Sequence, residues 1–357
     1  MGNPYSAVKV FHHIDALNAM EKGIPIAPLY IRLKPTNVCN HHCRYCTYGS
    51  GNTNEKTANR NRIDHKDSIP WDKMQEILAD IGNMGVKAVT FSGGGEPLVY
   101  PNIVEAANIC TKNKIDLSLI TNGQLLKGER AEAFYKAKWV RISFDSPVAE
   151  EYASIRGLKT EDYDQVINNI RKFAKNKNKR CTLGVNYVIS KDNADRVYEA
   201  AKLIRELGAD NIKFAAVIEN EQGYHDSIKD NVIKQINKAI MDFENDRFRI
   251  INNYTNDCGD KNFTSLSFSK CYTCRLVTVI AADQKVYFCH TRAYDSNAVV
   301  GELKSQSFQS MWFSQETQNR LKCLNPINDC KNFCVYEKRN EIIQAYYDAD
   351  GEHVNFI

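Results

Sequence analysis

Apolar residues along this chain recur at two spacings, which alternate from residue 29 to about residue 218. Short runs rich in β-branched and aromatic residues predict strands, and apolar residues at helical spacing between them predict helices. Such alternation is typical of a parallel sheet covered by helices. The predicted strands are 29–34, 88–92, 117–121, 140–145, 183–189 and 212–218. The predicted helices are about 71–81, 101–113, 127–137, 162–175 and 197–207.

Six strands are too few for a closed eight-stranded barrel, so we predict an α/β fold with a partial (β/α)6 TIM-like barrel. A long amphipathic helix, about 228–244, then ends the alternation. The cysteine-rich, hairpin-like remainder predicts a smaller second domain. The expected parts are an N-terminal extension 1–28, a core 29–225, a linking helix and connector 226–257, a cysteine-rich domain 258–340 and a tail 341–357.

The segment 49–68 departs from this pattern. Gly, Asn, Lys and Arg dominate it, and no apolar periodicity is visible. A loop of this length is often a functional cover. The alternative, a plain surface loop, stays open at this stage.

Composition and charge exclude several classes of protein. No apolar run approaches 18 residues, so we expect no membrane partner, and the N-terminus lacks the pattern of a secretory signal. A net charge of +4 is too mild to indicate nucleic acid. Twelve cysteines without a secretory signal favour metal ligands over disulfides, and we predict a cytoplasmic protein.

The first chemical feature is the run Cys39-Asn40-His41-His42-Cys43-Arg44-Tyr45-Cys46. It follows the first predicted strand, where parallel α/β folds place their chemistry. Three thiolates can hold three irons of a 4Fe–4S cluster, one short of the usual four, so that the last iron stays open. A zinc site closed by His41 or His42 is the alternative.

Polar residues also follow the later strands. Gly93-Gly94-Gly95-Glu96-Pro97 comes after the second strand, where the glycines permit close backbone approach and Glu96 supplies a carboxylate. By itself this run also fits a plain βα turn. The third, fourth and fifth strands are followed or ended by further polar groups, namely Asn122, Ser143, Asp145, Arg156 and Asn186.

Together, the cysteine run, the Gly93–Pro97 run and the α/β order resemble the radical SAM superfamily over about residues 29–220. The resemblance implies a 4Fe–4S cluster on Cys39, Cys43 and Cys46, with S-adenosylmethionine (SAM) on the open iron. It implies reductive cleavage of SAM to a 5′-deoxyadenosyl radical, which takes a hydrogen atom from a substrate carbon. It also implies a one-electron donor such as flavodoxin or ferredoxin.

The resemblance assigns SAM-binding roles as well. Tyr45 would lie near the adenine, Gly94 and Gly95 would allow the backbone to approach, and Glu96 would meet the methionine ammonium. Ser143 and Arg156 would hold the SAM carboxylate, and a guanidinium suits that role. Asn122 and Asn186 would face the ribose or the substrate. For each of them a strand-end cap or a surface hydrogen bond is the alternative.

A second group of cysteines lies near the C-terminus. Cys271-x2-Cys274 precedes a hairpin-like segment that Cys289 closes, and Cys330-x3-Cys334 comes from a distant segment. The arrangement is similar to the SPASM and twitch domains of radical SAM enzymes, which bind auxiliary iron–sulfur clusters. Where that family usually has a glycine, five residues before Cys289, this chain has Gln284. We expect one auxiliary 4Fe–4S cluster on four of the five cysteines, with a second cluster and a zinc site as open alternatives.

His290 directly follows Cys289. In sulfatase-maturating relatives an acidic residue follows the matching cysteine and acts as a base, and a histidine can take a proton at neutral pH. We predict His290 as the catalytic base, with a surface or supporting histidine as the alternative. Cys110 and Cys181 fall in core positions and are predicted to be buried apolar residues.

The sequence thus predicts a radical SAM oxidoreductase. The favoured reaction is a two-electron oxidation of a small polar molecule such as a sugar or aminocyclitol. In an epimerisation instead, Cys323 or Cys258 would return a hydrogen atom. A peptide maturase is the second hypothesis, made less favourable by the short segment before the first strand. A zinc-stabilised binding module without catalytic activity is the third.

Overall fold

The computed structural model describes residues 6–49, 63–218, 223–258, 268–330, 334–353 and 355. Within these ranges the strands form one ten-stranded sheet, in the order β10-β9-β8-β1-β2-β3-β4-β5-β6-β7. Pairing is parallel from β8 through β7 and antiparallel among β8, β9 and β10. The strands are β1 (Tyr30–Leu33), β2 (Ala88–Phe91), β3 (Asp116–Thr121), β4 (Trp139–Ser143), β5 (Thr182–Ile189), β6 (Asn211–Ala216), β7 (Arg249–Asn252), β8 (Val277–Ile280), β9 (Lys285–Tyr287) and β10 (Val299–Glu302).

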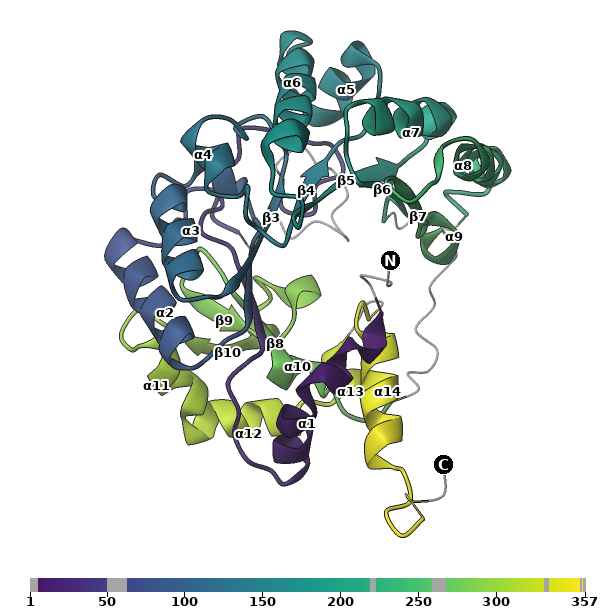
Figure 1. The fold of residues 1–357 in the computed structure, drawn as a ribbon. Coiled ribbons are helices and arrows are strands. Elements are labelled where there is room, and N and C mark those ends of the chain that lie inside the picture. The colour runs from purple at the N-terminus through teal and green to yellow at the C-terminus, as the bar shows by residue number, and fades with distance from the viewer. Residues whose placement is uncertain are drawn as a thin grey trace.

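Helices cover the outer side of the arc of parallel strands (Figure 1). They are α2 (Trp71–Asn83), α3 (Ile103–Lys112), α4 (Glu129–Glu132), α5 (Ala149–Arg156), α6 (Glu161–Asn176), α7 (Val197–Glu206) and α8 (Lys229–Phe243). Helix α2 shows why they pack there, because its apolar positions repeat every three to four residues and are fully buried. The α/β fold class with its parallel-rich sheet, predicted from the alternating pattern, is confirmed.

Two details of the predicted order are wrong. The alternation does not end with the helix at 228–244, because β7 follows α8 and pairs in parallel with β6. Strand β7 has only four residues and ends in Asn252, so it carries no apolar period that the sequence could reveal. The helix predicted at about 127–137 is the single turn α4, because Gly128, with φ of 54°, sets its start and short turns follow it.

The C-terminal cysteine-rich segment shares the main sheet. Strand β8 pairs in parallel with β1, and β9 and β10 extend the same sheet beyond it. Short helices flank these strands. Helix α10 (Thr273–Leu276) precedes β8, and α11 (Phe308–Phe313), α12 (Gln315–Cys323) and α13 (Pro326–Asp329) follow β10. The segment predicted to be a loop or cover, 49–68, lies largely outside the described residues.

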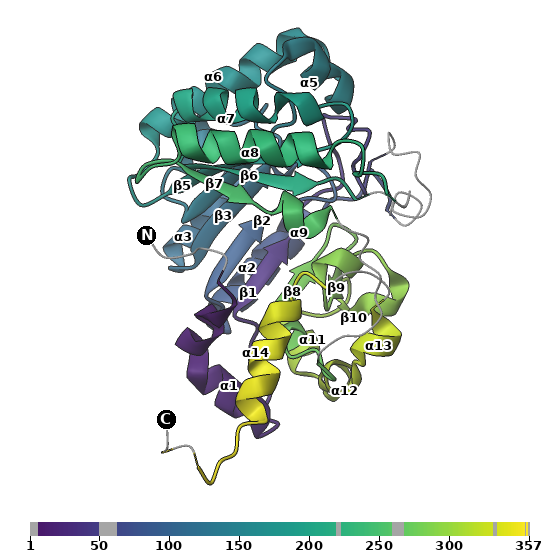
Figure 2. The same cartoon turned by 90° about the vertical axis from the view of Figure 1, so that its right-hand side faces the viewer.

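The two ends of the chain pack together. The 3-10 helix Ala7–His13 and α1 (Ile14–Glu21) lie beside the C-terminal helix α14 (Glu337–Tyr347) (Figure 2). Val10, Leu17, Met20 and Ile343 form a small buried cluster there with the start of β8. No helix in the described ranges is long and apolar enough to cross a membrane.

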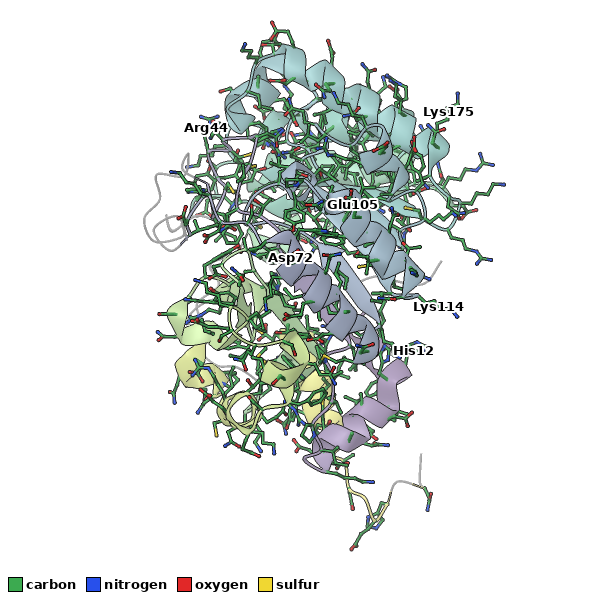
Figure 3. The ribbon with its side chains drawn as sticks, turned by 90° about the vertical axis from the view of Figure 1, so that its left-hand side faces the viewer. His12, Arg44, Asp72, Glu105, Lys114 and Lys175 are labelled. Carbon is green, nitrogen blue, oxygen red and sulfur yellow. The ribbon has the colours of Figure 1, made fainter. Side chains whose placement is uncertain are left out.

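The carboxyl ends of the strands meet at one edge of the sheet. Figure 3 shows Arg44 of the cysteine loop at the opposite side of the molecule from Lys114 and Lys175, which precede β3 and β5. The polar residues that the sequence singles out after successive strands therefore share this edge.

Candidate active site

The cysteine loop begins beyond the end of β1 and is anchored on the C-terminal end of α5. The backbone N–H groups of His42 and Arg44 donate to the carbonyl oxygens of Arg156 (2.9 Å) and Ile155 (3.1 Å). Gly157, with φ of 63°, has no room for a side chain, because a Cβ there would lie 2.9 Å from the His42 backbone oxygen. The end of α5 thus fixes the path of the loop between Cys39 and Cys46.

A buried ion pair lies directly beneath this loop. Arg156 pairs with Asp145, and its Nη1 lies 3.7 Å from the Cys43 Sγ. The Tyr45 hydroxyl donates to the same Asp145 carboxylate at 2.5 Å. Tyr45 is thereby held toward the end of β4.

Arg156 nevertheless retains binding capacity. Its Nη2 atom is buried and has no hydrogen-bond partner among the described residues. A buried, unpaired guanidinium nitrogen is costly, and a carboxylate is its natural partner. This orphaned atom fits the predicted role of Arg156 toward the carboxylate of SAM.

The chemistry of the donor set also suits a cluster. Burial raises the pKa of the Cys43 thiol to about 12, so as a free side chain Cys43 is a thiol at neutral pH. An iron–sulfur cluster binds cysteines as thiolates and displaces their protons. The bonds to iron therefore compensate for the cost of burying the thiolate charge. Among the described residues no three Cys, His, Asp or Glu side chains converge closely enough to hold a single metal ion.

The glycine run after β2 packs against the start of the cysteine loop. A Cβ on Gly95 would lie 2.1 Å from the Val38 backbone oxygen, and one on Gly94 would lie 2.3 Å from Asn37 Oδ1. Backbone hydrogen bonds join the two segments, from Gly95 N–H to the Thr36 oxygen (3.1 Å) and from Glu96 N–H to the Val38 oxygen (2.9 Å). The close approach that the glycines permit is therefore an approach to residues 36–38.

Glu96 is a buried carboxylate with three donors around it. It accepts hydrogen bonds from Thr121 Oγ1 (2.6 Å), Asn122 N–H (2.7 Å) and Leu98 N–H (3.0 Å). Burial raises the pKa of Glu96, and these hydrogen bonds oppose the rise. No described lysine or arginine forms an ion pair with it, so the site fits an incoming ammonium group such as that of SAM.

The strand-end amides have different surroundings. Asn122 donates from Nδ2 to Asn40 Oδ1 (2.8 Å) and accepts from Gln124 N–H (3.1 Å), which ties the end of β3 to the cysteine loop. Ser143 and Asn186 stand opposite each other on β4 and β5 and are half-buried. Their roles toward SAM or substrate stay predictions.

Gln124 is a site residue that the sequence did not reveal. Its Oε1 lies 2.6 Å from Asn40 Nδ2 and 3.0 Å from His41 Nε2, and its Nε2 donates to Asp162 at 2.7 Å. Burial lowers the pKa of His41 to about 3, so His41 stays neutral. Gln124 thus positions the middle of the cysteine loop from the turn after β3, a relation that only the fold creates.

The C-terminal cysteines also gather. The pKa values of the half-buried thiols Cys330 and Cys334 are both raised to about 12, by burial first, and the neighbouring Cys271 and Cys289 add to the rise. Gln284, at the position where related domains have glycine, adopts φ of 62°, so the hairpin keeps the left-handed turn without the glycine. Cys271, Cys289, Cys330 and Cys334 thus lie near one another beyond the β8–β9 hairpin, and Cys274 lies beside Cys271; their role as ligands of an auxiliary cluster stays a prediction.

Asn340 of α14 is a second residue that the sequence did not reveal. It is fully buried, accepts from the Thr273 N–H and Oγ1 at 2.9 Å each, and its Nδ2 lies 3.8 Å from the Cys271 Sγ. Hydrogen bonds of this kind fix the orientation of a ligand. The C-terminal helix therefore supports the geometry of Cys271.

Cys274 lies beside Cys271, and its thiol donates to backbone oxygens. Its Sγ lies 2.9 Å from the Cys271 backbone oxygen and 3.8 Å from the Leu321 backbone oxygen, and it is buried. We predict that Cys271→Ser lowers the iron content by about four atoms per chain, whereas Cys274→Ser retains it. Iron and sulfide analysis after anaerobic reconstitution measures the difference. Equal loss in both variants would contradict this choice of ligands.

His290 lies between the two cysteine groups. Its Nδ1 is 3.1 Å from the Tyr336 hydroxyl, and its backbone oxygen accepts from the Tyr48 hydroxyl at 3.4 Å. Burial, with Arg32 and Lys34 nearby, lowers the pKa of His290 well below its usual range. The imidazole is therefore neutral, the form that can accept a proton, but the same shift makes it a weaker base than a free histidine.

Lys34, the residue after β1, is a buried lysine that the sequence did not single out. Lys34 is only 3% exposed. Its ammonium lies over the rings of Tyr48 and Tyr294, 4.0 and 5.1 Å from the ring centroids. Burial, and next the charge of Arg32, lowers the pKa of Lys34 to about 7.

This shift predicts a pH dependence of stability. Between pH 7 and pH 10 the unfolded chain holds a proton on Lys34 that the folded chain has released, so the free energy of unfolding rises with pH. Relative to Lys34→Met, the wild type should gain about 2 kcal/mol between pH 7 and pH 9. Denaturant titrations of both proteins at the two pH values measure this. Parallel pH profiles would contradict it.

Comparison with known proteins shows which families this chain is similar to. Residues 33–204 match the family model of the radical SAM superfamily. The PqqA peptide cyclase of Gluconobacter oxydans is 28% identical over 197 residues, which are 54% of this chain and 50% of that protein. The GTP 3′,8-cyclase of Clostridium perfringens is 31% identical over 185 residues, 50% of this chain and 52% of that protein. The chain spans about half the length of the curated relatives it matches.

Solved structures share the fold over a larger part of the chain. Streptococcus suis SuiB bound to S-adenosylmethionine has a TM-score of 0.61 at 19% identity, covering 89% of this chain and 73% of SuiB. Native anSMEcpe with bound AdoMet has a TM-score of 0.60 at 17% identity, covering 88% of each chain. At these identities the comparison shows a common architecture, and that architecture extends through the C-terminal segment.

Proposed function

Because residues 33–204 of this chain form a radical SAM domain, we propose that it cleaves SAM reductively and abstracts a hydrogen atom from a substrate carbon. The observation that carries the proposal is the cysteine loop, held at the ends of the strands next to the buried carboxylate of Glu96 and the orphaned guanidinium nitrogen of Arg156. When bound, SAM and a 4Fe–4S cluster supply the one-electron cleavage that yields a 5′-deoxyadenosyl radical.

The protein's own residues would bind and orient the cluster and SAM. Cys39, Cys43 and Cys46 would hold the cluster. Glu96 would receive the ammonium of SAM, and Arg156 its carboxylate through Nη2, while the Asp145 ion pair holds the guanidinium in place. These groups come from different strand ends, so the sheet sets their relative positions.

For the reaction we propose a two-electron oxidation of a small polar molecule, or its epimerisation. After the substrate loses a hydrogen atom, an oxidation still has to release a proton and an electron. His290 would accept the proton on its neutral imidazole. The second electron would pass to an auxiliary 4Fe–4S cluster on Cys271, Cys289, Cys330 and Cys334.

A peptide substrate is the second candidate, and the comparisons favour it. One curated relative is a PqqA peptide cyclase, SuiB has been solved bound to its precursor peptide SuiA, and anSMEcpe has been solved with a peptide. In the peptide case the same residues would act on a side chain of a longer partner. The two candidates therefore differ in the size of the substrate and share the SAM chemistry.

Anaerobic reconstitution followed by single-turnover assays tests the proposal. We expect about eight irons per chain, four for each cluster, and formation of 5′-deoxyadenosine when SAM and a reductant are added. Zinc in place of iron, without SAM cleavage, would refute the proposed chemistry. A cell extract that contains the substrate should stimulate 5′-deoxyadenosine formation. Digesting the extract with protease first separates the two candidates, because only a peptide substrate is destroyed.

A further inference from the structure

One face of the parallel sheet carries basic side chains, which lie near the middle and the carboxyl ends of the strands. Residues paired in register on neighbouring strands point to the same side of a sheet. Arg32 pairs with Thr90, Arg141 pairs with Gly184, and Lys213 pairs with Asn186. The register along β2, β3, β4 and β5 joins these pairs into one face, and Lys34, two residues after Arg32, shares it.

This face is the concave one, away from the helices. The residues that alternate with the basic ones, such as Leu33, Ile142 and Phe214, are fully buried against the helical layer. By contrast, Arg32, Arg141, Asn186 and Lys213 are half-buried, although they stand on central strands. The concave face is therefore open to other molecules.

Two of these cations lack an anionic partner. The Lys34 ammonium contacts the faces of Tyr48 and Tyr294, and no described residue accepts a hydrogen bond from it or pairs with it. The Nε of Arg32 is buried without a hydrogen-bond partner in the described part of the chain. Leaving a buried cation unpaired is costly, so an anion from outside would stabilise both groups.

The described carboxylate near this pair is otherwise engaged, and the other acidic neighbours are the thiols of Cys46, beside Lys34, and Cys289, beside Arg32. Asp283 influences Lys34 electrostatically, but its carboxylate accepts from the Tyr287 hydroxyl (2.5 Å) and the Lys285 N–H (3.2 Å). Lys34 and Arg32 thus have no carboxylate of their own, and the lowered pKa of Lys34 reflects the cost of burying its charge.

The unpaired cations also lie at the right place for a substrate. Tyr48, whose ring covers the Lys34 ammonium, is two residues beyond Cys46, and its hydroxyl reaches the backbone of His290. Lys34 and Arg32 also act on the pKa of His290. An anion bound by them would therefore sit between the cysteine loop and the candidate base.

We propose that Lys34 and Arg32 bind a phosphate or carboxylate group of the substrate. The inference rests on the proposed function, since it assigns the chemical class of that enzyme's substrate. It predicts a substrate with an anionic group close to the carbon that loses hydrogen. Such charge-assisted hydrogen bonds would fix the orientation of that carbon.

Isothermal titration calorimetry of the anaerobically reconstituted holoprotein tests this, with inorganic phosphate and acetate in separate arms at constant ionic strength set by chloride. We expect one of the two anions to bind. Lys34→Met and Arg32→Gln should weaken that binding about ten- to hundredfold, the cost of a hydrogen bond to a charged group. Lys34→Arg, which keeps the charge, should retain it.

Lys175→Met is the matched control, because it removes the same charge from the exposed end of α6, which points away from the sheet (Figure 3). Its anion affinity should equal that of the wild type. No binding of either anion to the wild type would overturn the proposal. An unchanged anion affinity in Lys34→Met would also overturn it. If the reduction potential of the clusters shifted in that variant, the cations would instead balance the charge of the clusters. A wild type that binds an anion but yields no 5′-deoxyadenosine would refute only the proposed function.

Discussion

Replacing Cys43 with alanine is expected to abolish 5′-deoxyadenosine formation altogether. Cys43 is the middle ligand of the loop, and it alone among the three lies against the Arg156 guanidinium, at 3.7 Å. Without its thiolate only two cysteines of the loop remain, and the cluster loses one of its three protein ligands. The iron content of the reconstituted variant should fall by about four atoms per chain.

The control for this variant is Cys110→Ala. Cys110 is fully buried in α3, within the main hydrophobic core, so its substitution removes a buried thiol of the same size. It should cost about 1 kcal/mol of stability and leave both iron content and SAM cleavage intact. SAM cleavage that survives in Cys43→Ala at the wild-type rate would show that the loop does not hold the reactive cluster.

Gly95→Ala should be nearly as damaging, although it adds a single methyl group. The new Cβ would lie 2.1 Å from the Val38 oxygen and 2.5 Å from the Asn37 carbonyl carbon, and both belong to backbone that cannot rotate away. The chain before Cys39 must therefore shift, and the backbone hydrogen bond from Glu96 to Val38 must break or lengthen. We expect a loss of stability of about 1–3 kcal/mol and a SAM dissociation constant raised at least about tenfold.

Gly351→Ala serves as its counterpart, because a Cβ there meets no atom within 4 Å. Equilibrium binding of SAM to the reconstituted proteins and denaturant titration compare the two substitutions. Normal affinity in Gly95→Ala would mean that the start of the cysteine loop adapts without moving the ligands. The contrast between the two glycines separates a steric effect from a general effect of glycine replacement.

The parallel core was predictable because each strand carries its own local signal. The strands at 88–92 and 183–189 are rich in apolar, β-branched and aromatic residues, most of them buried. Strand β7 lacks such a local signal, and it is recognised as a strand only by its parallel pairing with β6. The pairing of β8 with β1 was equally hidden, because it joins segments from opposite ends of the chain.

Within the site the sequence revealed the ligand types but not their supports. Cysteine spacing and the glycine run are local patterns. Gln124, Asn340 and the Asp145–Arg156 pair act through contacts between distant segments, and their residue types are common on any surface. Lys34 was missed for the same reason, since a lysine after a strand is ordinarily exposed and only the fold buries it.

The pairing of β8 with β1 also has a consequence for how the protein is made. During synthesis β1 emerges early, but the strand that covers its outer edge is completed only after most of the chain has left the ribosome. Until then β1 presents unpaired backbone groups, an arrangement prone to pairing with other chains. A nascent or C-terminally truncated chain would therefore depend on chaperones, and expression without the C-terminal segment would yield aggregates.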